Sequence, residues 1–175
     1  MIIVCSMQAE RLKMSNKTSN VSIGTDGKLM IEDARILYRN FSGTGTDYNR
    51  EGDRNFNVII EDQDTALAMQ KDGWNVKFRP ARDEGELPIY HIKVNVNYRS
   101  AIAPKVYLHT GDAMQMLDES TVGELDNSEI LACDMLISPY HYDRNGNKGI
   151  SGYLDTLHVR IKEDPFAHKY ANLNG

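Results

Sequence analysis

Short runs of alternating apolar and polar residues, separated by turns rich in glycine, asparagine and aspartate, leave few folds open to this chain. The clearest run spans residues 89–98. Its apolar face consists of Ile92, Val94, Val96 and Tyr98, and its polar face of His91, Lys93, Asn95 and Asn97. Alternation with a period of two is typical of a β-strand that packs one face on a core. No alternation of strands with helices, as in a parallel sheet, is present.

Seven or eight short strands are expected. They cover residues 21–31, 34–41, 55–60, 74–79, 89–98, 105–109, 130–142 and 150–162. Asn145-Gly146, between the last two, is a strong signal for a hairpin turn. A short helix is expected over residues 65–71, capped by Asp62 or Asp64, and a helical turn over residues 121–127. We therefore predict a mainly β protein, an OB-like antiparallel barrel with one or two short helices, with a β-sandwich as the alternative.

The length of 175 residues is that of one domain with a substantial core. We expect that domain over residues 21–165, with Trp74 in its core rather than serving as a stacking platform for bases. Residues 1–20 are expected to be a disordered or mis-annotated extension, with Met14 as the true initiator, and residues 166–175 a frayed tail. The two cysteines, Cys5 and Cys133, have no metal-type spacing and fit a reducing cytosol.

Arginines and aromatic residues alternate between residues 35 and 56. The arginines are Arg35, Arg39, Arg50 and Arg54, and the aromatic residues are Tyr38, Phe41, Tyr48 and Phe56. Cations for phosphates and flat rings for unstacked bases are what a single-stranded nucleic acid requires. The alternative is a hairpin with its rings in the core and its arginines in solvent. The net charge of −5 does not itself indicate a polyanion partner, but a basic groove can lie on an acidic body.

Tyr38 and Phe41 should point to opposite faces of their strand, because side chains alternate. Phe41 shares its face with Arg35 and Arg39, so we assign Phe41 to the groove and Tyr38 to the core side. A bend before Gly43 would reverse this assignment, and both residues therefore remain candidates.

A second cluster of rings and cations occurs near the predicted hairpin turn. Tyr140 and Tyr142 share one strand face, and Arg144 and Lys148 lie on the loop beyond them. This arrangement suits a finger that contacts a nucleic acid strand. It equally suits tyrosines that cap the end of a barrel, with loop charges in solvent.

The sequence offers no catalytic or metal-binding pattern. The histidines lack the paired spacings of common metal sites, and Gly43-Thr44-Gly45 lacks the lysine of a P-loop and the third glycine of a dinucleotide turn. No G-x-S-x-G nucleophile motif is present. We therefore expect no enzyme activity, no cofactor and no metal.

The sequence between about residues 31 and 170 resembles a group of bacteriophage single-stranded-DNA-binding proteins. The similar segments are RILYRNFSG, YNREGDRNF, DGWNVK, KVYL and YHYDRNGNKGISGYL. The resemblance implies an OB-like protein that coats replication or recombination intermediates in the cytoplasm of the infected host. Its partners would be single-stranded DNA and phage replication or recombination proteins. The stretch from Phe166 to Gly175 is not acidic, which argues against recruitment of partners through an acidic tail.

The candidate nucleic-acid-binding residues combine both clusters with three cations on the central strands. They are Tyr38, Arg39, Phe41, Tyr48, Arg50, Arg54, Lys77, Arg79, Lys93, Tyr140, Tyr142, Arg144 and Lys148. The alternative function is that of a phage structural or protein-interaction β module without nucleic-acid binding, which the acidic net charge fits as well.

Overall fold

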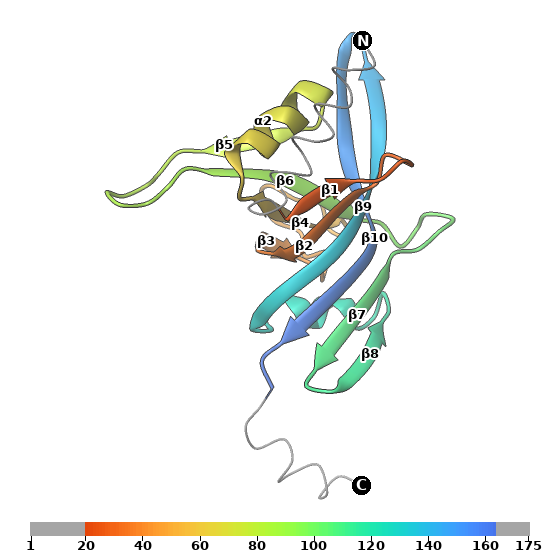
Figure 1. The fold of residues 1–175 in the computed structure, drawn as a ribbon. Helices are drawn as coiled ribbons and strands as arrows, with labels where there is room; N and C mark the ends of the chain where they lie inside the picture. Colours follow the sequence, from red (N-terminus) through yellow and green to blue (C-terminus); the bar gives the residue numbers. More distant parts are fainter. Residues whose placement is uncertain (1–19, 164–175) are drawn as a thin grey trace, which may run out of the picture.

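A computed structural model describes residues 20–163 of the chain. It contains ten strands, one α-helix and one 3-10 helix (Figure 1). They are β1 (Val21–Ile23), β2 (Leu29–Ala34), β3 (Ile36–Asn40), β4 (Arg54–Ile60), α2 (Gln63–Asp72), β5 (Val76–Arg79), β6 (Ile89–Val96), β7 (Lys105–Thr110), β8 (Ala113–Leu117), η1 (Val122–Asp126), β9 (Ile130–Arg144) and β10 (Asn147–Ile161). The expectations for Met14 and for the two chain ends concern residues 1–19 and 164–175, which lie outside the described part.

All ten strands belong to one sheet, in the order β1-β2-β9-β10-β6-β4-β3. β5 adds to β6, β7 adds to β10, and β8 adds to β7. β10 is fifteen residues long and pairs with β9 along one edge. Its other edge accepts two strands in turn, β6 near Gly152 and β7 from Thr156 to Arg160. The mainly β prediction is confirmed.

The predicted antiparallel barrel is wrong in two respects. Within residues 20–163 the sheet stays open, because β2 and β3 are not paired and the chain passes from one to the other through Arg35 alone. The sheet is also mixed, because β10 runs parallel to both β6 and β7. A strand as long as β10 can cover its second edge with two shorter strands, so this edge is protected without closure.

The β9–β10 hairpin turns where the sequence predicts it. Asn145 and Gly146 have φ angles of 54° and 84°, the left-handed conformation that a tight two-residue hairpin turn requires. Asn147 then pairs with Arg144, and the ladder continues to the other end of both strands. In Figure 1 the tip of this hairpin projects beyond α2.

Helix α2 follows β4 and packs against the sheet through Ala66 and Met69, which are buried. The carboxylate of Asp62 accepts a hydrogen bond from the backbone N–H of Thr65 at 3.1 Å, so Asp62 is the N-cap. Gly73, with φ of 107°, ends the helix. In the part of the chain described here, no helix has the length and apolarity needed to cross a membrane.

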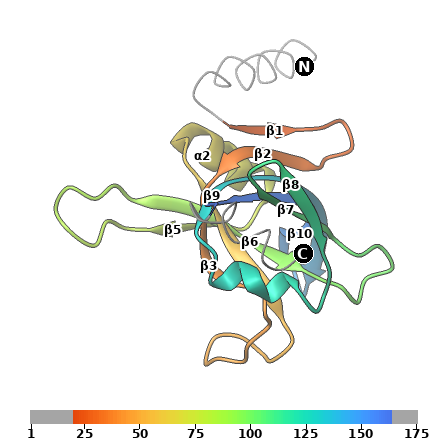
Figure 2. The ribbon, with the colours of Figure 1, turned by 90° about the horizontal axis from the view of Figure 1, so that it is seen from below.

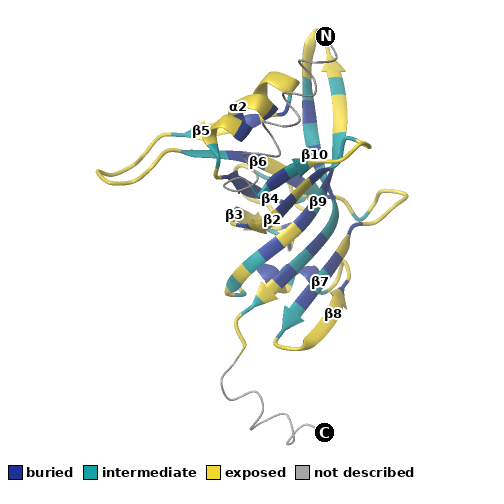
Figure 3. Ribbon diagram, viewed as in Figure 1, coloured by how far each residue is buried: buried dark blue, intermediate teal, exposed yellow. Residues whose placement is uncertain are grey.

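The core lies inside the curve of the sheet, where the inward side chains of the central strands are buried (Figure 3). Phe41 and Phe56 stack at 5.1 Å between ring centroids and are fully buried. Trp74 is 6% exposed, which confirms its predicted core position. Cys133 is also buried, and burial raises the pKa of its thiol to about 12.

Candidate nucleic-acid interface

Strand β3 carries one extra residue near its middle. Leu37 pairs with Asn57 of β4, and Asn40 pairs with Asn55, so three steps along β3 match two steps along β4. This is a β-bulge, and Tyr38 within it has φ of 52°, a conformation uncommon for an aromatic residue. An extra residue reverses the facing of the side chains that follow it. Simple alternation therefore does not relate Tyr38 to Phe41.

The assignment of Phe41 to the groove and of Tyr38 to the core is wrong, because Phe41 is the buried ring and Tyr38 is the exposed one. Phe41 is 0% exposed against Phe56, so its ring cannot stack on a base. Tyr38 is 51% exposed and lies on the outer side of the sheet. The bulge is the physical cause, since it turns Phe41 inward two residues before Gly43.

Tyr38 joins a group of cations on the outer side of β5 and β6. We call this group the β5–β6 face; it consists of Tyr38, Lys77, Arg79, His91 and Lys93. Arg79 donates a hydrogen bond from Nη1 to the Tyr38 hydroxyl at 3.1 Å, and Lys77 lies opposite His91 in the ladder. Lys93 is two residues beyond His91 and points the same way. None of the ion pairs within residues 20–163 involves its three cations.

His91 is the buried centre of this face. Its Nδ1 lies 2.8 Å from the amide oxygen of Asn57, and Tyr38 packs edge-on against its ring at 5.9 Å. Burial lowers the pKa of His91, and the positive charges of Lys77 and Arg79 lower it further. The imidazole is therefore neutral at pH 7 and donates Nδ1–H to Asn57.

Three tyrosines extend the polar surface onto the β9–β10 hairpin. Tyr140 is 54% exposed and packs edge-on against Tyr153 at 5.7 Å. Tyr153 pairs with Asn95 of β6, which places it beside the β5–β6 face. Tyr142 is half-buried and donates its hydroxyl hydrogen to the amide oxygen of Asn75 at 2.9 Å. The hairpin rings thus lie on the side of the sheet that carries Lys93 of β6.

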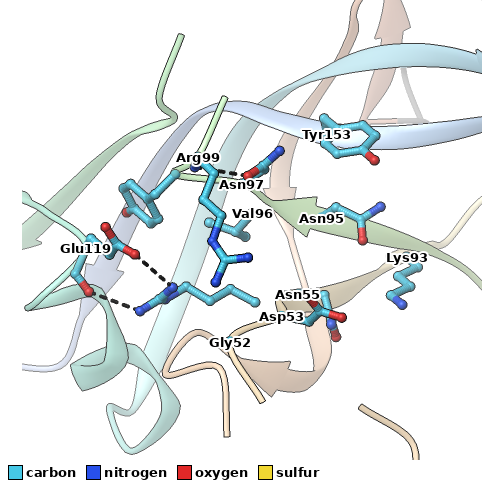
Figure 4. A pocket seen from close by; sticks show the side chains of 12 residues that line it. Gly52, Asp53, Asn55, Lys93, Asn95, Val96, Asn97, Arg99, Glu119 and Tyr153 are labelled. Carbon is cyan, nitrogen blue, oxygen red and sulfur yellow. Dashed lines mark hydrogen bonds and ion pairs between the residues drawn. The ribbon is translucent and has the colours of Figure 1, made fainter. Parts of the chain in front are cut away.

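Two neighbouring cavities hollow this surface. The first, of about 390 Å³, lies between β6, the β3–β4 connection and the turn before η1 (Figure 4). Its lining includes Lys93, Asn95, Tyr98, Arg99 and Glu119. The second, of about 580 Å³, is lined in part by the hairpin residues Pro139 and Tyr140. Asn97 and Tyr153 line both cavities, so the two hollows adjoin one another.

The connection between β3 and β4, residues 41–53, projects from the body (Figure 2). Asparagine amides hold it together: Asn49 Nδ2 donates to the carbonyl of Asp53 at 2.7 Å, and Asn55 Nδ2 donates to Asn49 Oδ1 at 2.7 Å. At its tip Tyr48 is 99% exposed, and Arg50 is exposed beside it. A ring and a cation therefore stand in solvent on a connection with fixed internal hydrogen bonds.

Comparison with known proteins assigns the chain to a family. The family model described as "Putative phage ssDNA-binding domain" matches residues 18–174. The chain belongs to this phage single-stranded-DNA-binding family. The predicted resemblance is thereby confirmed. No curated protein sequence matches the chain.

Three solved structures of the single-stranded DNA-binding protein from bacteriophage Enc34 share the fold of this family member. The structure in complex with ssDNA has a TM-score of 0.54 at 14% identity, and the alignment covers 84% of this chain and 93% of the Enc34 chain. A C-terminal truncation gives 0.53 at 14% identity with the same coverage. A third structure gives 0.52 at 13% identity and covers 89% and 94%.

Not all sequence-predicted residues of this family member gather at the β5–β6 face and the cavities. Arg39 donates from Nη1 to the carbonyls of Leu125 at 2.9 Å and Ser128 at 2.7 Å, so it anchors η1. Arg144 lies at the tip of the β9–β10 hairpin, and Lys148 there approaches Asp143 at 3.9 Å. Neither hairpin cation lines either of these two cavities.

Sequence reasoning missed Tyr98, Arg99 and Tyr153 as parts of the site. Tyr98 was counted with the apolar face of its strand, but β6 ends at Val96 and the chain turns there. Arg99 stands alone in a loop and gave no signal. Tyr153 follows Ser151 by two residues on the hairpin face that carries Tyr140, so alternation across the predicted turn could have identified it.

Proposed function

We propose that the protein binds single-stranded DNA, without reading its sequence, across the β5–β6 face and the adjoining cavities. The observation that carries the proposal is the set of cations on the β5–β6 face that have no acidic partner among residues 20–163, with the rings of Tyr38 and Tyr153 beside them. Membership of the phage family and the fold shared with an Enc34 protein solved in complex with ssDNA support it.

In this proposal the cations contact the phosphates of the strand. Lys77, Arg79 and Lys93 are long side chains on a rigid sheet, so they present charge at fixed positions along a backbone. Exposed Arg50 on the β3–β4 connection extends the same set. Binding through phosphates depends strongly on salt and little on sequence.

The exposed rings stack on the bases. Tyr38, Tyr48 and Tyr140 are each more than half exposed, and the face of any base can stack on such a ring. A duplex hides its base faces, so single strands bind more tightly. A protein of this kind has no catalytic step; it coats DNA exposed during replication or recombination in the infected host cell.

Fluorescence anisotropy with labelled single-stranded and double-stranded oligonucleotides tests the proposal. The wild type should bind the single strand more tightly than the duplex of the same sequence. The double change Lys77→Gln and Lys93→Gln should weaken binding and reduce the salt slope by about 1.4, which corresponds to two lost phosphate contacts at about 0.7 each.

The control variant carries Lys71→Gln and Lys105→Gln, which remove the same charge from exposed positions on α2 and β7. It should bind nearly as well as the wild type. Equal affinity for duplex, or absence of binding at low salt, contradicts the proposed function and favours a protein-interaction module. Equal effects of the two double variants on DNA affinity would mean that DNA does not bind at the β5–β6 face.

A further inference from the structure

Arg54, the first residue of β4, is held by weak contacts at the edge of the first cavity. Its Nη1 lies 3.4 Å from the Glu119 carboxylate, and its Nη2 lies 3.4 Å from the Glu119 carbonyl (Figure 4). The guanidinium lies over the ring of Tyr98, 5.7 Å from its centroid. Only 18% of the arginine side chain is exposed, against 57% of the Glu119 side chain.

Two buried polar atoms at this cavity lack a hydrogen-bond partner among the described residues. They are Nε of Arg54 and the hydroxyl oxygen of Tyr98. Nearly all buried polar groups in proteins have a partner, so two unpartnered groups beside one cavity require an explanation. Both carry a hydrogen to donate, since burial raises the pKa of Tyr98 to about 12 and keeps the hydroxyl protonated. A ligand with several acceptor oxygens would satisfy them.

Two further cations line the same cavity. Lys93 enters from β6, and Arg99 enters from the loop beyond it. Nη2 of Arg99 lies 3.3 Å from the point that a Cβ of Gly52 would occupy. A side chain at residue 52 would therefore crowd the Arg99 guanidinium, and glycine leaves room for it. Within residues 20–163 neither cation belongs to an ion pair. The cavity thus holds more positive charge than its two carboxylates, Asp53 and Glu119, neutralise.

We propose that this cavity binds one backbone phosphate of the single strand, and that the Glu119 carboxylate occupies Arg54 in the free protein and is displaced on binding. The inference rests on the proposed function and adds a built-in competitor to it. A phosphate accepts hydrogen bonds from Arg54, Tyr98 and Arg99 together, whereas Glu119 reaches Arg54 alone at a long distance. Glu119 is exposed, so its carboxylate moves into water at little cost.

The variant Glu119→Gln tests the competitor, with Asp53→Asn as the matched control. Both remove one negative charge from the same cavity and both keep the shape of the side chain, but only Glu119 forms an ion pair with Arg54. Glu119→Gln should tighten binding to a labelled oligo(dT) by about two- to fivefold relative to Asp53→Asn, the range that an exposed ion pair supports. The plot of log K against log salt should become steeper for Glu119→Gln. In this variant Arg54 exchanges an anion from solution for the phosphate, whereas in the wild type it exchanges the Glu119 carboxylate.

A second pair of variants checks that the gain acts through Arg54. In an Arg54→Gln background, Glu119→Gln should give no more gain than Asp53→Asn. Tyr98→Phe should weaken binding without changing the ratio of the affinities of the Glu119→Gln and Asp53→Asn variants. This variant is used instead if Arg54→Gln does not fold. If the wild type binds oligo(dT) and Glu119→Gln equals Asp53→Asn, the inference is overturned and the proposed function stands. If the wild type does not bind, the proposed function itself fails.

Discussion

At the scale of single residues, the bulge at Tyr38 decides which aromatic ring supports the core. Phe41 is fully buried against Phe56, so Phe41→Ala should destabilise the fold by about 3–5 kcal/mol, as loss of a buried phenyl ring does. Urea denaturation followed by tryptophan fluorescence measures this change. Molecules that remain folded should bind DNA normally. A variant with unchanged stability would contradict the inward facing of Phe41.

Tyr38 should behave in the opposite way. Its ring is half exposed beside Arg79, so Tyr38→Ala should cost about 1–3 kcal/mol of binding free energy with little loss of stability. Tyr38→Phe keeps the ring and loses only the hydroxyl that accepts from Arg79, so it should bind almost as the wild type does. Anisotropy titrations of both variants compare them. A large loss with Tyr38→Phe would mean that the hydroxyl, not the ring, matters.

His91 gives the stability of the protein a dependence on pH. Burial, with Lys77 and Arg79 nearby, lowers its pKa in the folded state below the ordinary 6.5. As the pH falls below about 6.5, the unfolded chain therefore binds a proton that the folded chain resists, and stability decreases by at most about 1.4 kcal/mol per pH unit. His91→Gln should remove this decrease, because its amide is neutral and can still donate to Asn57.

The matched control for this pH dependence is His141→Gln, which changes an exposed histidine. Denaturation curves between pH 7 and pH 5 should show the same slope for this control as for the wild type. Carboxylates titrate alike in all three proteins, so the difference between the curves isolates His91. Identical slopes for His91→Gln and the wild type would contradict the lowered pKa.

Alternation predicted most residue facings, but it failed at Tyr38. It correctly placed Ile92, Val94 and Val96 on one apolar face, and all three are buried because β6 is a regular strand there. A bulge depends on how two strands pair. Tyrosine rarely adopts the left-handed backbone conformation that Tyr38 has, so its residue type does not indicate the bulge. The facing of Phe41 therefore depends on how β3 pairs with β4, and this pairing could not be predicted from the local sequence.

At the scale of elements, η1 fixes the end of β3 through one carboxylate. The two oxygens of Asp126 accept hydrogen bonds from the backbone N–H groups of Phe41 at 2.7 Å and Ser42 at 3.0 Å. Asp126→Ala should leave both donors without a partner and cost about 1–3 kcal/mol of stability. Asp47→Ala, in the exposed β3–β4 connection, is the control and should cost almost nothing. Chemical denaturation distinguishes them, and equal midpoints would mean that η1 does not anchor β3.

Elements with local signals were predictable, and those that depend on distant partners were not. The cap at Asp62, the stop at Gly73 and the turn at Asn145 each use the geometry of a few neighbouring residues. Residues 111–117 gave no clear pattern, yet they contain β8, which exists because β7 offers it a ladder edge. The parallel pairing of β10 with β6 and β7 has the same origin, so the open sheet could not be read from single strands.

At the scale of the whole molecule, the acidic net charge and the cationic face predict a defined response to salt. If about four to six cations contact phosphates, the plot of log K against log salt should have a slope of about −3 to −4, at about 0.7 per contact. Titrations at several salt concentrations measure this slope. The net charge of −5 should not flatten it, because charges far from the strand are screened. A flat response would mean that the named cations do not contact the backbone.

The position of β10 in the sheet has a consequence for folding during synthesis on the ribosome. A ribosome releases the N-terminal strands first, yet β2 finds its ladder partner in β9 and β6 finds part of its own in β10. A nascent chain that has not reached residue 130 therefore carries strand edges for which residues 20–129 supply no partner. Such edges pair readily with other chains. Completion of the sheet waits for its final strand to emerge, and the nascent protein is most prone to aggregation in the interval before that.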